Sequence, residues 1–272
     1  MKKMEEDDVH VGLTITPTTL TACPRSTLIS RLLPYYALPV HFDSPSLGTA
    51  LHGDAEQGAR ELGYEAEVLI EADIPGIGLM KGRPDMICVE PAGYTGTSII
   101  QDTKLTNQGS LATVRNKKDG LAKPDHCAQL SFYRIMIHKT RGILLQDGIV
   151  NYVCPLSGPE RAKQGGTNWV RRPVKWMDLD ELLAFKPFDG LTTIGEHAAI
   201  LNEAKVQLAA GKSPEEVIAA LPLYGYTYIG GNGRWCQEYC EANFECSRLG
   251  GGEGVLANWQ RNLHFADPEE TA

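Results

Sequence analysis

The chain has 272 residues, of which 42% are hydrophobic and 22% charged, as is ordinary for a globular protein large enough to bury a sizeable core. No apolar run approaches the roughly 18 residues of a membrane span, and Met1–His10 has no apolar segment behind its lysines, so we expect a cytoplasmic protein without a secretory signal. The net charge of −8 argues against a tight, charge-driven, non-specific nucleic-acid binder.

The first half of the chain predicts helices followed by strands. A helix is expected from Thr16 through Leu33, and a second from Ser44 through Leu62, where serine and an early proline are typical of a helix start. The period then changes to that of strands. Three strands joined by short turns are expected at 66–74, 85–90 and 97–104, which predicts an antiparallel meander.

The second half alternates helices and strands. Pro124 begins a helix that runs to about His138 and carries Gln129 and Tyr133 on one face. Further strands are expected at 142–145, 148–154 and 169–176, and helices at 178–186 and at 193–220 with a break near Gly211. The fold class is therefore α/β, with a mixed central sheet flanked by helices. The domain is expected to span 14–249, between disordered tails at 1–13 and 250–272.

Two acids and a lysine occur at strand ends of the predicted meander. Asp85 opens the second strand, and Asp102-Thr103-Lys104 ends the third. Strand side chains repeat every two residues, so Asp102 and Lys104 point to the same face. If the two strands pair as a hairpin, Asp85 lies near Asp102.

This set fits metal-assisted phosphodiester hydrolysis. Carboxylates, with the Thr103 backbone carbonyl as a further oxygen ligand, suit Mg²⁺ or Mn²⁺. A lysine beside the ion can orient or deprotonate the attacking water, or offset charge in the transition state. The alternative is a solvated Asp-x-Lys ion pair with no function. His52, on the preceding helix, is a candidate metal ligand that favours the functional interpretation.

The seven cysteines are unevenly placed. Cys236, Cys240 and Cys246 lie close together near the C-terminus, and Cys23 stands alone near the start. The other three, Cys88, Cys127 and Cys154, lie in apolar or helical segments and are interpreted as small buried hydrophobic residues. An odd number of cysteines without an export signal argues against a disulfide framework.

Four motifs in order resemble the PD-(D/E)xK nuclease superfamily, and within it the RecB-like exonucleases. They are Gly48-Thr-Ala-Leu-His52, Gly82-Arg-Pro-Asp85, Asp102-Thr-Lys104 and Gln129-Leu-Ser-Phe-Tyr133. The resemblance implies a restriction-endonuclease-like fold in a single domain. It gives metal binding to His52, both acids and the Thr103 carbonyl, assistance of the attacking water to Lys104, and positioning of DNA to Gln129 and Tyr133.

The cysteines resemble those of a subgroup that includes CRISPR-associated exonucleases and AddB-type helicase–nucleases. There, one cysteine before the histidine motif and three near the C-terminus hold a [4Fe–4S] cluster that staples the domain ends. The resemblance gives these roles to Cys23, Cys236, Cys240 and Cys246. The first C-terminal gap is three residues where the family has two, and Zn²⁺ is the alternative to iron.

The resemblance therefore implies a DNA exonuclease acting on single-stranded ends. No phosphate-binding Walker motif is present, so ATP-driven unwinding would come from a helicase or nuclease-complex partner. A DNA-end-binding or assembly subunit of a recombination, repair or CRISPR adaptation complex, with little cleavage of its own, is the alternative.

Overall fold

The computed structural model describes residues 13–33, 57–89, 98–106, 108–154, 169–187 and 192–221, together with Cys246 and Leu249. The chain divides into two compact units, which are described separately. The first combines Met1–Thr14, Ala22–His41 and Lys186–Ala272, and the second holds Ile15–Thr21 and Phe42–Phe185. No described helix is both long and apolar enough to cross a bilayer.

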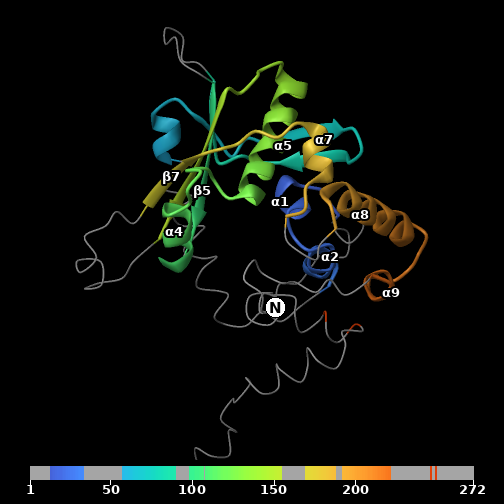
Figure 1. The fold of residues 1–272 in the computed structure, drawn as a ribbon. Helices are drawn as coiled ribbons and strands as arrows, with labels where there is room; N and C mark the ends of the chain where they lie inside the picture. The colour runs from blue at the N-terminus through green and yellow to red at the C-terminus, as the bar shows by residue number, and fades with distance from the viewer. Residues whose placement is uncertain are drawn as a thin grey trace, which may run out of the picture. The chain divides into compact units, whose positions relative to one another are not determined.

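The second unit contains a five-stranded mixed sheet and a separate hairpin (Figure 1). Its helices are α1 (Pro17–Leu20), α4 (Gln108–Arg115), α5 (Pro124–Arg141) and α7 (Leu179–Ala184). The five-stranded sheet has the order β1 (Glu65–Ala66), β4 (Met86–Cys88), β5 (Ile99–Leu105), β6 (Asp147–Val153) and β7 (Trp169–Pro173). The hairpin consists of β2 (Ile70–Ile74) and β3 (Gly78–Gly82).

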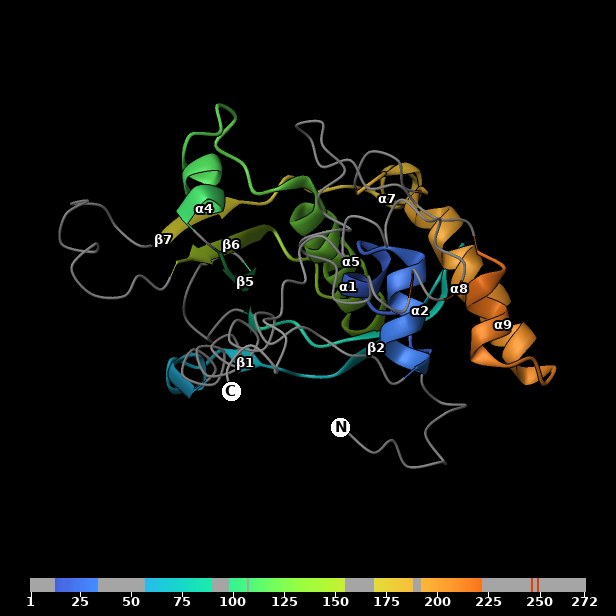
Figure 2. The same cartoon turned by 90° about the horizontal axis from the view of Figure 1, so that it is seen from below.

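The sheet is antiparallel except for one pair. β5 and β6 run parallel, and α4 and α5 lie in the crossover that a parallel pair requires. Figure 2 shows β5, β6 and β7 side by side, with α4 next to β7. A mixed sheet flanked by helices confirms the predicted fold class.

Helix α5 is the central packing element of this unit. It contacts β5 of the large sheet, β2 of the hairpin, and both α1 and α7. Pro124 occupies its first turn, and Gly142, with φ 69°, ends it in the left-handed conformation that glycine adopts without strain. The core of this unit is largely apolar, and its largest buried members are Tyr152, Phe132, Ile15, Leu20, Ile74, Ile77, Met80, Ile87 and Ile100.

The first unit is helical where it is described. It contains α2 (Pro24–Leu32), α8 (Ile194–Ala209) and α9 (Pro214–Ala219). Capping boxes begin α8 at Thr193 and α9 at Ser213, where each hydroxyl accepts the backbone N–H of a glutamate three residues later. Packing of α2 against α8 and α9 buries apolar residues from all three helices: Leu28, Ile29, Leu32, Ile194, Ala198, Leu201, Val217 and Ile218.

Several predicted element boundaries are wrong. The helix expected from Thr16 to Leu33 is two helices, because the residue before Pro24 takes an extended conformation and Cys23 becomes the N-cap of α2. The strand expected at 66–74 is broken at Glu67, whose φ is 54°, so its two parts enter different sheets. β3 was not predicted, and 142–145 forms no strand. The 44–62 segment is described only from 57, where 57–61 is helical.

Candidate active site

The predicted pairing of the two acid-bearing strands is confirmed. β4 pairs with β5 in antiparallel register, with Met86 opposite Gln101, so the next residue outward on each strand is Asp85 and Asp102. Asp85 lies just before β4 begins, and its Oδ2 accepts the Thr103 backbone N–H at 2.7 Å. If β4 extended further, one of its backbone carbonyls would accept this hydrogen bond. The Asp85 carboxylate accepts it instead.

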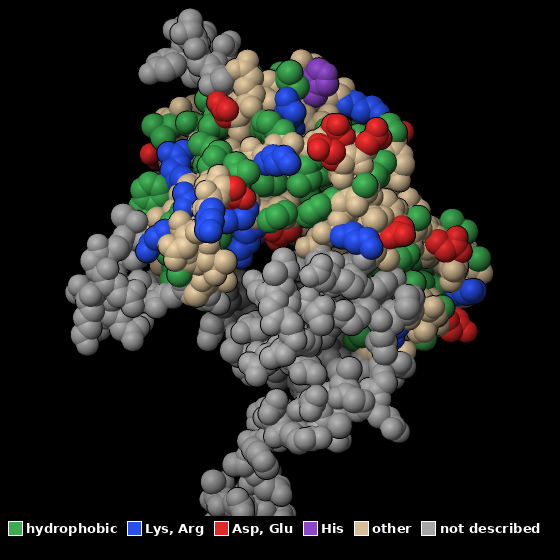
Figure 3. Space-filling view, viewed as in Figure 1, with side chains coloured by type: hydrophobic (Ala, Val, Ile, Leu, Met, Phe, Trp, Pro, Cys, Tyr) green, Lys and Arg blue, Asp and Glu red, His purple; other side chains and the backbone are tan. Residues whose placement is uncertain are grey.

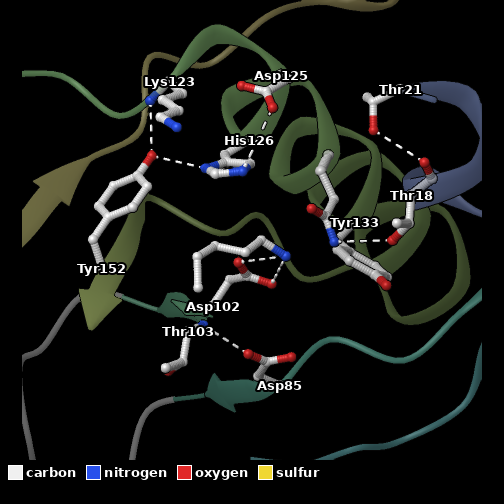
Figure 4. Close-up of polar contacts among 12 residues, drawn as sticks. Thr18, Thr21, Asp85, Asp102, Thr103, Lys123, Asp125, His126, Tyr133 and Tyr152 are labelled. Carbon is white, nitrogen blue, oxygen red and sulfur yellow. Dashed lines mark hydrogen bonds and ion pairs between the residues drawn. The ribbon is translucent and has the colours of Figure 1, made fainter. Parts of the chain in front are cut away.

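The same geometry orients the Thr103 carbonyl. In an extended strand the N–H and C=O of one residue point to the same side. Because the Thr103 N–H reaches Asp85, its carbonyl also points to the side where β4 has ended. The structure therefore brings together Asp85, Asp102, Thr103 and Lys104 (Figure 4).

Asp102 is a carboxylate at a core position. It alternates with Ile100 on the buried face of β5 and is only 3% exposed, which is rare for an acid unless it is paired. Lys104 Nζ lies 2.9 Å from Oδ2 and donates a hydrogen bond to Oδ1 at 3.1 Å. Oδ2 is buried and accepts no hydrogen bond from the part of the chain that is described, although the Lys104 charge is beside it.

Lys104 carries its positive charge in an acidic surrounding. Burial by itself would lower the pKa of Lys104, but the charge of Asp102, its hydrogen bond, and the charges of Asp85 and Asp125 together raise it. The lysine is therefore an ammonium at neutral pH. The carboxylates and the ammonium form one electrostatic cluster at the end of β5.

The donor set at this site fits a hard divalent cation. Two carboxylates and a main-chain oxygen are the ligand types that Mg²⁺ and Mn²⁺ prefer, and Asp102 Oδ2 retains an unused acceptor. The described residues contain no group of three or more His, Cys, Asp or Glu side chains placed to hold a metal ion. His52, the predicted third side-chain ligand, lies outside the described residues.

Gln129 and Tyr133 are buried on the face of α5 that meets α1 and the hairpin. Gln129 Nε2 donates to Thr18 Oγ1 at 3.2 Å, and the Tyr133 hydroxyl donates to the Arg83 carbonyl at 3.1 Å. The ring of Tyr133 packs against Gly82, where a Cβ would stand 2.7 Å from Cε1. These contacts hold the segment that leads into Asp85. Tyr133 is a positioning residue in this geometry.

His126 and Tyr152 belong to the surroundings of the site but were missed in the sequence. His126 Nδ1 lies 2.8 Å from the Tyr152 hydroxyl, and Nε2 lies 3.5 Å from Asp125 Oδ2. In Figure 4, Asp102 is drawn between Asp85 on one side and His126 on the other. The spacing of His126 three residues before Gln129 on one helix was the available signal, because i and i+3 share a face.

Two basic stretches of the sequence are joined in the fold. Arg172 of β7 donates from Nε to the Val114 carbonyl at 3.1 Å and from Nη2 to the Arg115 carbonyl at 2.7 Å, at the end of α4. Figure 3 shows lysine and arginine side chains gathered over α4 and β7. The basic residues of the two stretches are Arg115, Lys117, Lys118, Arg171, Arg172 and Lys175.

Of the four cysteines predicted to hold a metal cluster, the two that are described lie in the first unit. Cys23 is buried at the N-cap of α2, and Cys246 is half-buried, whereas Cys236 and Cys240 lie outside the described residues. Arg25, which is 1% exposed, donates to the Cys246 carbonyl at 3.3 Å. Burial raises the pKa of the Cys246 thiol, and the charge and hydrogen bond of Arg25 act in the opposite direction. Burial has the larger effect, so the net direction at Cys246 is toward the neutral thiol.

The three remaining cysteines lie elsewhere. Cys127 and Cys154 are buried, as predicted, and Cys88 is half-buried. All three belong to the second unit.

No family model and no curated protein matches the chain. Among solved structures, it is similar to the crystal structure of SSO0001, with 19% identity and a TM-score of 0.44 over 91% of this chain and 89% of that one. It is also similar to the crystal structure of LHK-Exo in complex with dAMP, with 16% identity and a TM-score of 0.42 over 76% of this chain and 97% of that one. At these identities and TM-scores the likeness is distant and does not by itself establish a function.

Proposed function

We propose that the chain is a metal-dependent DNA exonuclease that hydrolyses phosphodiester bonds at single-stranded DNA ends. The observation that carries this proposal is Asp102, a carboxylate at a core position of β5 that is paired with Lys104 and lies across from Asp85. Burying a charged acid costs stability that even a paired cation does not always recover, and such buried charges are common at functional sites. A solvated surface pair, the alternative weighed from the sequence, does not fit an acid that is only 3% exposed.

The roles follow from the arrangement. Asp85, Asp102 and the Thr103 carbonyl would hold Mg²⁺ or Mn²⁺, with His52 as the further ligand implied by the resemblance. The bound ion would supply polarisation of the scissile phosphate and acidification of the attacking water. Lys104, held at 2.9 Å from Asp102, orients that water and offsets the negative charge that develops on the phosphate.

Other parts of the chain bind and position the DNA. The basic surface over α4 and β7 supplies charges for phosphates on either side of the cleaved bond. Tyr133 and Gln129 keep the Asp85 strand in place through Arg83 and α1.

The proposal includes a structural [4Fe–4S] cluster, whose ligands would be Cys23, Cys236, Cys240 and Cys246. Arg25, two residues after Cys23, contacts Cys246 across more than two hundred residues of sequence, which supports a common site for the two ends. Four thiolates distant in sequence would close a long loop and add metal binding to the folding free energy.

The test is degradation of end-labelled single-stranded DNA with Mn²⁺, with Mg²⁺ and with EDTA, beside Asp102→Asn. We expect wild-type protein to degrade the substrate only with metal. Asp102→Asn should lose at least about 100-fold in rate, because one ligand charge is removed. Labels at the 5′ or the 3′ end give the polarity.

The assembly-subunit alternative predicts a different result. A protein that binds DNA ends without cutting them would bind the labelled DNA with either metal and give no cleavage product. Retention of DNA without cleavage by protein that holds its metal would overturn the exonuclease proposal and favour that alternative.

A further inference from the structure

The N-terminal turn of α5 places an imidazole beside the proposed active site without any role assigned to it. Tyr152 of β6 is the direct register partner of Lys104 of β5, and both side chains stand on the face of the sheet that α5 covers. Neighbouring strands are about 4.8 Å apart, so the Tyr152 ring lies next to the Lys104 side chain. His126 reaches the hydroxyl of that tyrosine at 2.8 Å.

The hydrogen bonds around Tyr152 define the tautomer of His126. The Tyr152 oxygen accepts the Lys123 backbone N–H at 2.9 Å, so the phenol proton must find another acceptor. Tyr152 is 1% exposed, and its remaining polar neighbour in the described structure is His126 Nδ1. The phenol therefore donates to Nδ1, which leaves the imidazole proton on Nε2.

His126 is neutral in this position. Burial lowers its pKa, the neighbouring Lys104 and Lys123 charges act in the same direction, and Asp125 and Asp102 oppose them only in part. A neutral ring with a fixed Nε2–H is a hydrogen-bond donor that places no added positive charge beside Lys104.

The Nε2–H donor is not saturated by its protein neighbour. Its ion-pair partner, Asp125 Oδ2, lies 3.5 Å away, longer than the roughly 3.2 Å limit of a good N–H···O bond. The ring is 18% exposed, so an outside acceptor can approach it. An oxygen atom bound between Lys104 and α5 could accept the hydrogen bond that His126 Nε2–H donates.

We propose that His126 is a substrate-contacting residue, whose Nε2–H donates to a phosphate oxygen of the DNA strand held at Asp85, Asp102 and Lys104. This inference rests on the proposed nuclease function. Tyr152 is the positioning residue that keeps the donor on Nε2. A purely structural imidazole, which only ties the start of α5 to β6, is the competing account.

Two substitutions separate the donor from the contact with Tyr152. In His126→Asn the amide reaches the place of Nδ1 and can keep the Tyr152 contact, but nothing remains at the place of Nε2. In His126→Gln the amide N–H reaches toward the place of Nε2 and can restore the donor. His138→Asn, exposed near the end of the same helix, is the matched control.

We expect His126→Asn to lower kcat/KM for single-stranded DNA by about 10- to 100-fold, and His126→Gln to recover most of that loss. Tyr152→Phe should give an intermediate loss of kcat/KM. The aromatic ring stays, but the hydroxyl that fixes the tautomer of His126 is removed. Melting temperatures are measured on the same samples, and kcat/KM is normalised to folded protein. Equal activity of the wild-type and His126→Asn proteins would overturn the inference. Equal losses of activity in His126→Asn and His126→Gln, in proportion to their losses in melting temperature, would show a structural histidine and also overturn it.

Failure of the nuclease function gives a separate result. If wild-type protein does not cleave with any metal, the affinity for single-stranded DNA in Ca²⁺ becomes the readout. Weaker binding by His126→Asn with recovery in His126→Gln would still support the phosphate contact. Equal binding by all variants, or no binding by the wild type, would overturn it.

Discussion

At the scale of single residues, the interaction that matters most is the ion pair of Asp102 with Lys104. Its two members differ in exposure, with the lysine side chain 25% and the aspartate side chain 4% exposed. Removing the more exposed partner leaves a negative charge in a buried position. The stability of the fold therefore depends on the two side chains together, whereas the proposed nuclease activity requires each of them.

This difference can be measured by a double-mutant cycle. Lys104→Met should lower the free energy of unfolding by about 1–3 kcal/mol, because the Asp102 charge is left without its cation. Adding Asp102→Asn should recover most of that stability and restore no nuclease activity. Urea unfolding of the single and double variants gives the stabilities. Additive losses in the double variant would contradict the coupling.

At the scale of elements, the contact between α5 and the end of β3 positions the site. Gly82 has no room for a side chain, since a Cβ would lie 2.7 Å from Tyr133 Cε1 and 3.1 Å from Pro17 Cδ. The Tyr133 hydroxyl bonds the Arg83 carbonyl, only two residues before Asp85. The glycine therefore allows the close approach that fixes the Asp85 strand.

We expect Gly82→Ala to lower the free energy of unfolding by about 1–3 kcal/mol through overpacking, and to reduce nuclease activity by shifting Asp85. The control is Gly58→Ala, in the 57–61 helix, where a Cβ meets nothing within 4 Å. That change should be neutral or stabilising, because alanine favours the helix. Thermal unfolding and the DNA assay measure both effects. Wild-type behaviour of Gly82→Ala would refute the packing argument.

How far the sequence predicts these elements depends on whether a local signal exists. The α5 helix, the β4–β5 pairing and the shared face of Asp102 and Lys104 follow from periodicity and hairpin spacing, and all three are confirmed. The exit of the chain into a second sheet at Glu67 has no such signal, since a left-handed glutamate is set by tertiary contacts. The spacing to Gln129 places His126 on the right helix face, but its partner, Tyr152, lies on a strand 26 residues away, and only the β5–β6 register brings Tyr152 beside Lys104.

At the scale of the whole molecule, Arg25 joins distant parts of the first unit. Its two terminal nitrogens donate to the carbonyls of Ile218, Leu221, Cys246 and Leu249 at 2.6–3.3 Å. The carbonyls of Ile218 and Leu221 lie at the end of α9, where the helix dipole favours a cation. The guanidinium thus connects α2, α9 and the segment that carries Cys246.

The proposed cluster leads to a prediction at this scale. Protein purified without oxygen should contain about four irons per chain and absorb at about 400 nm. Cys23→Ser and Cys246→Ser should lose the iron and unfold at a lower temperature, because metal binding contributes to folding. Cys88→Ser, half-buried in the second unit, is the control and should keep the iron. Zinc in place of iron would establish the alternative metal and contradict the iron cluster.

The partners of Arg25 also impose an order on folding. Its hydrogen bonds join residues that are 193 to 224 positions apart in sequence, whereas the strands that carry Asp85, Asp102 and Tyr152 all lie between Glu65 and Pro173. Contacts between distant residues carry the larger chain-closure entropy and form late. During synthesis the sheet with the proposed catalytic residues can therefore assemble before Cys246 and Leu249 have left the ribosome, and so before Arg25 has made all its hydrogen bonds.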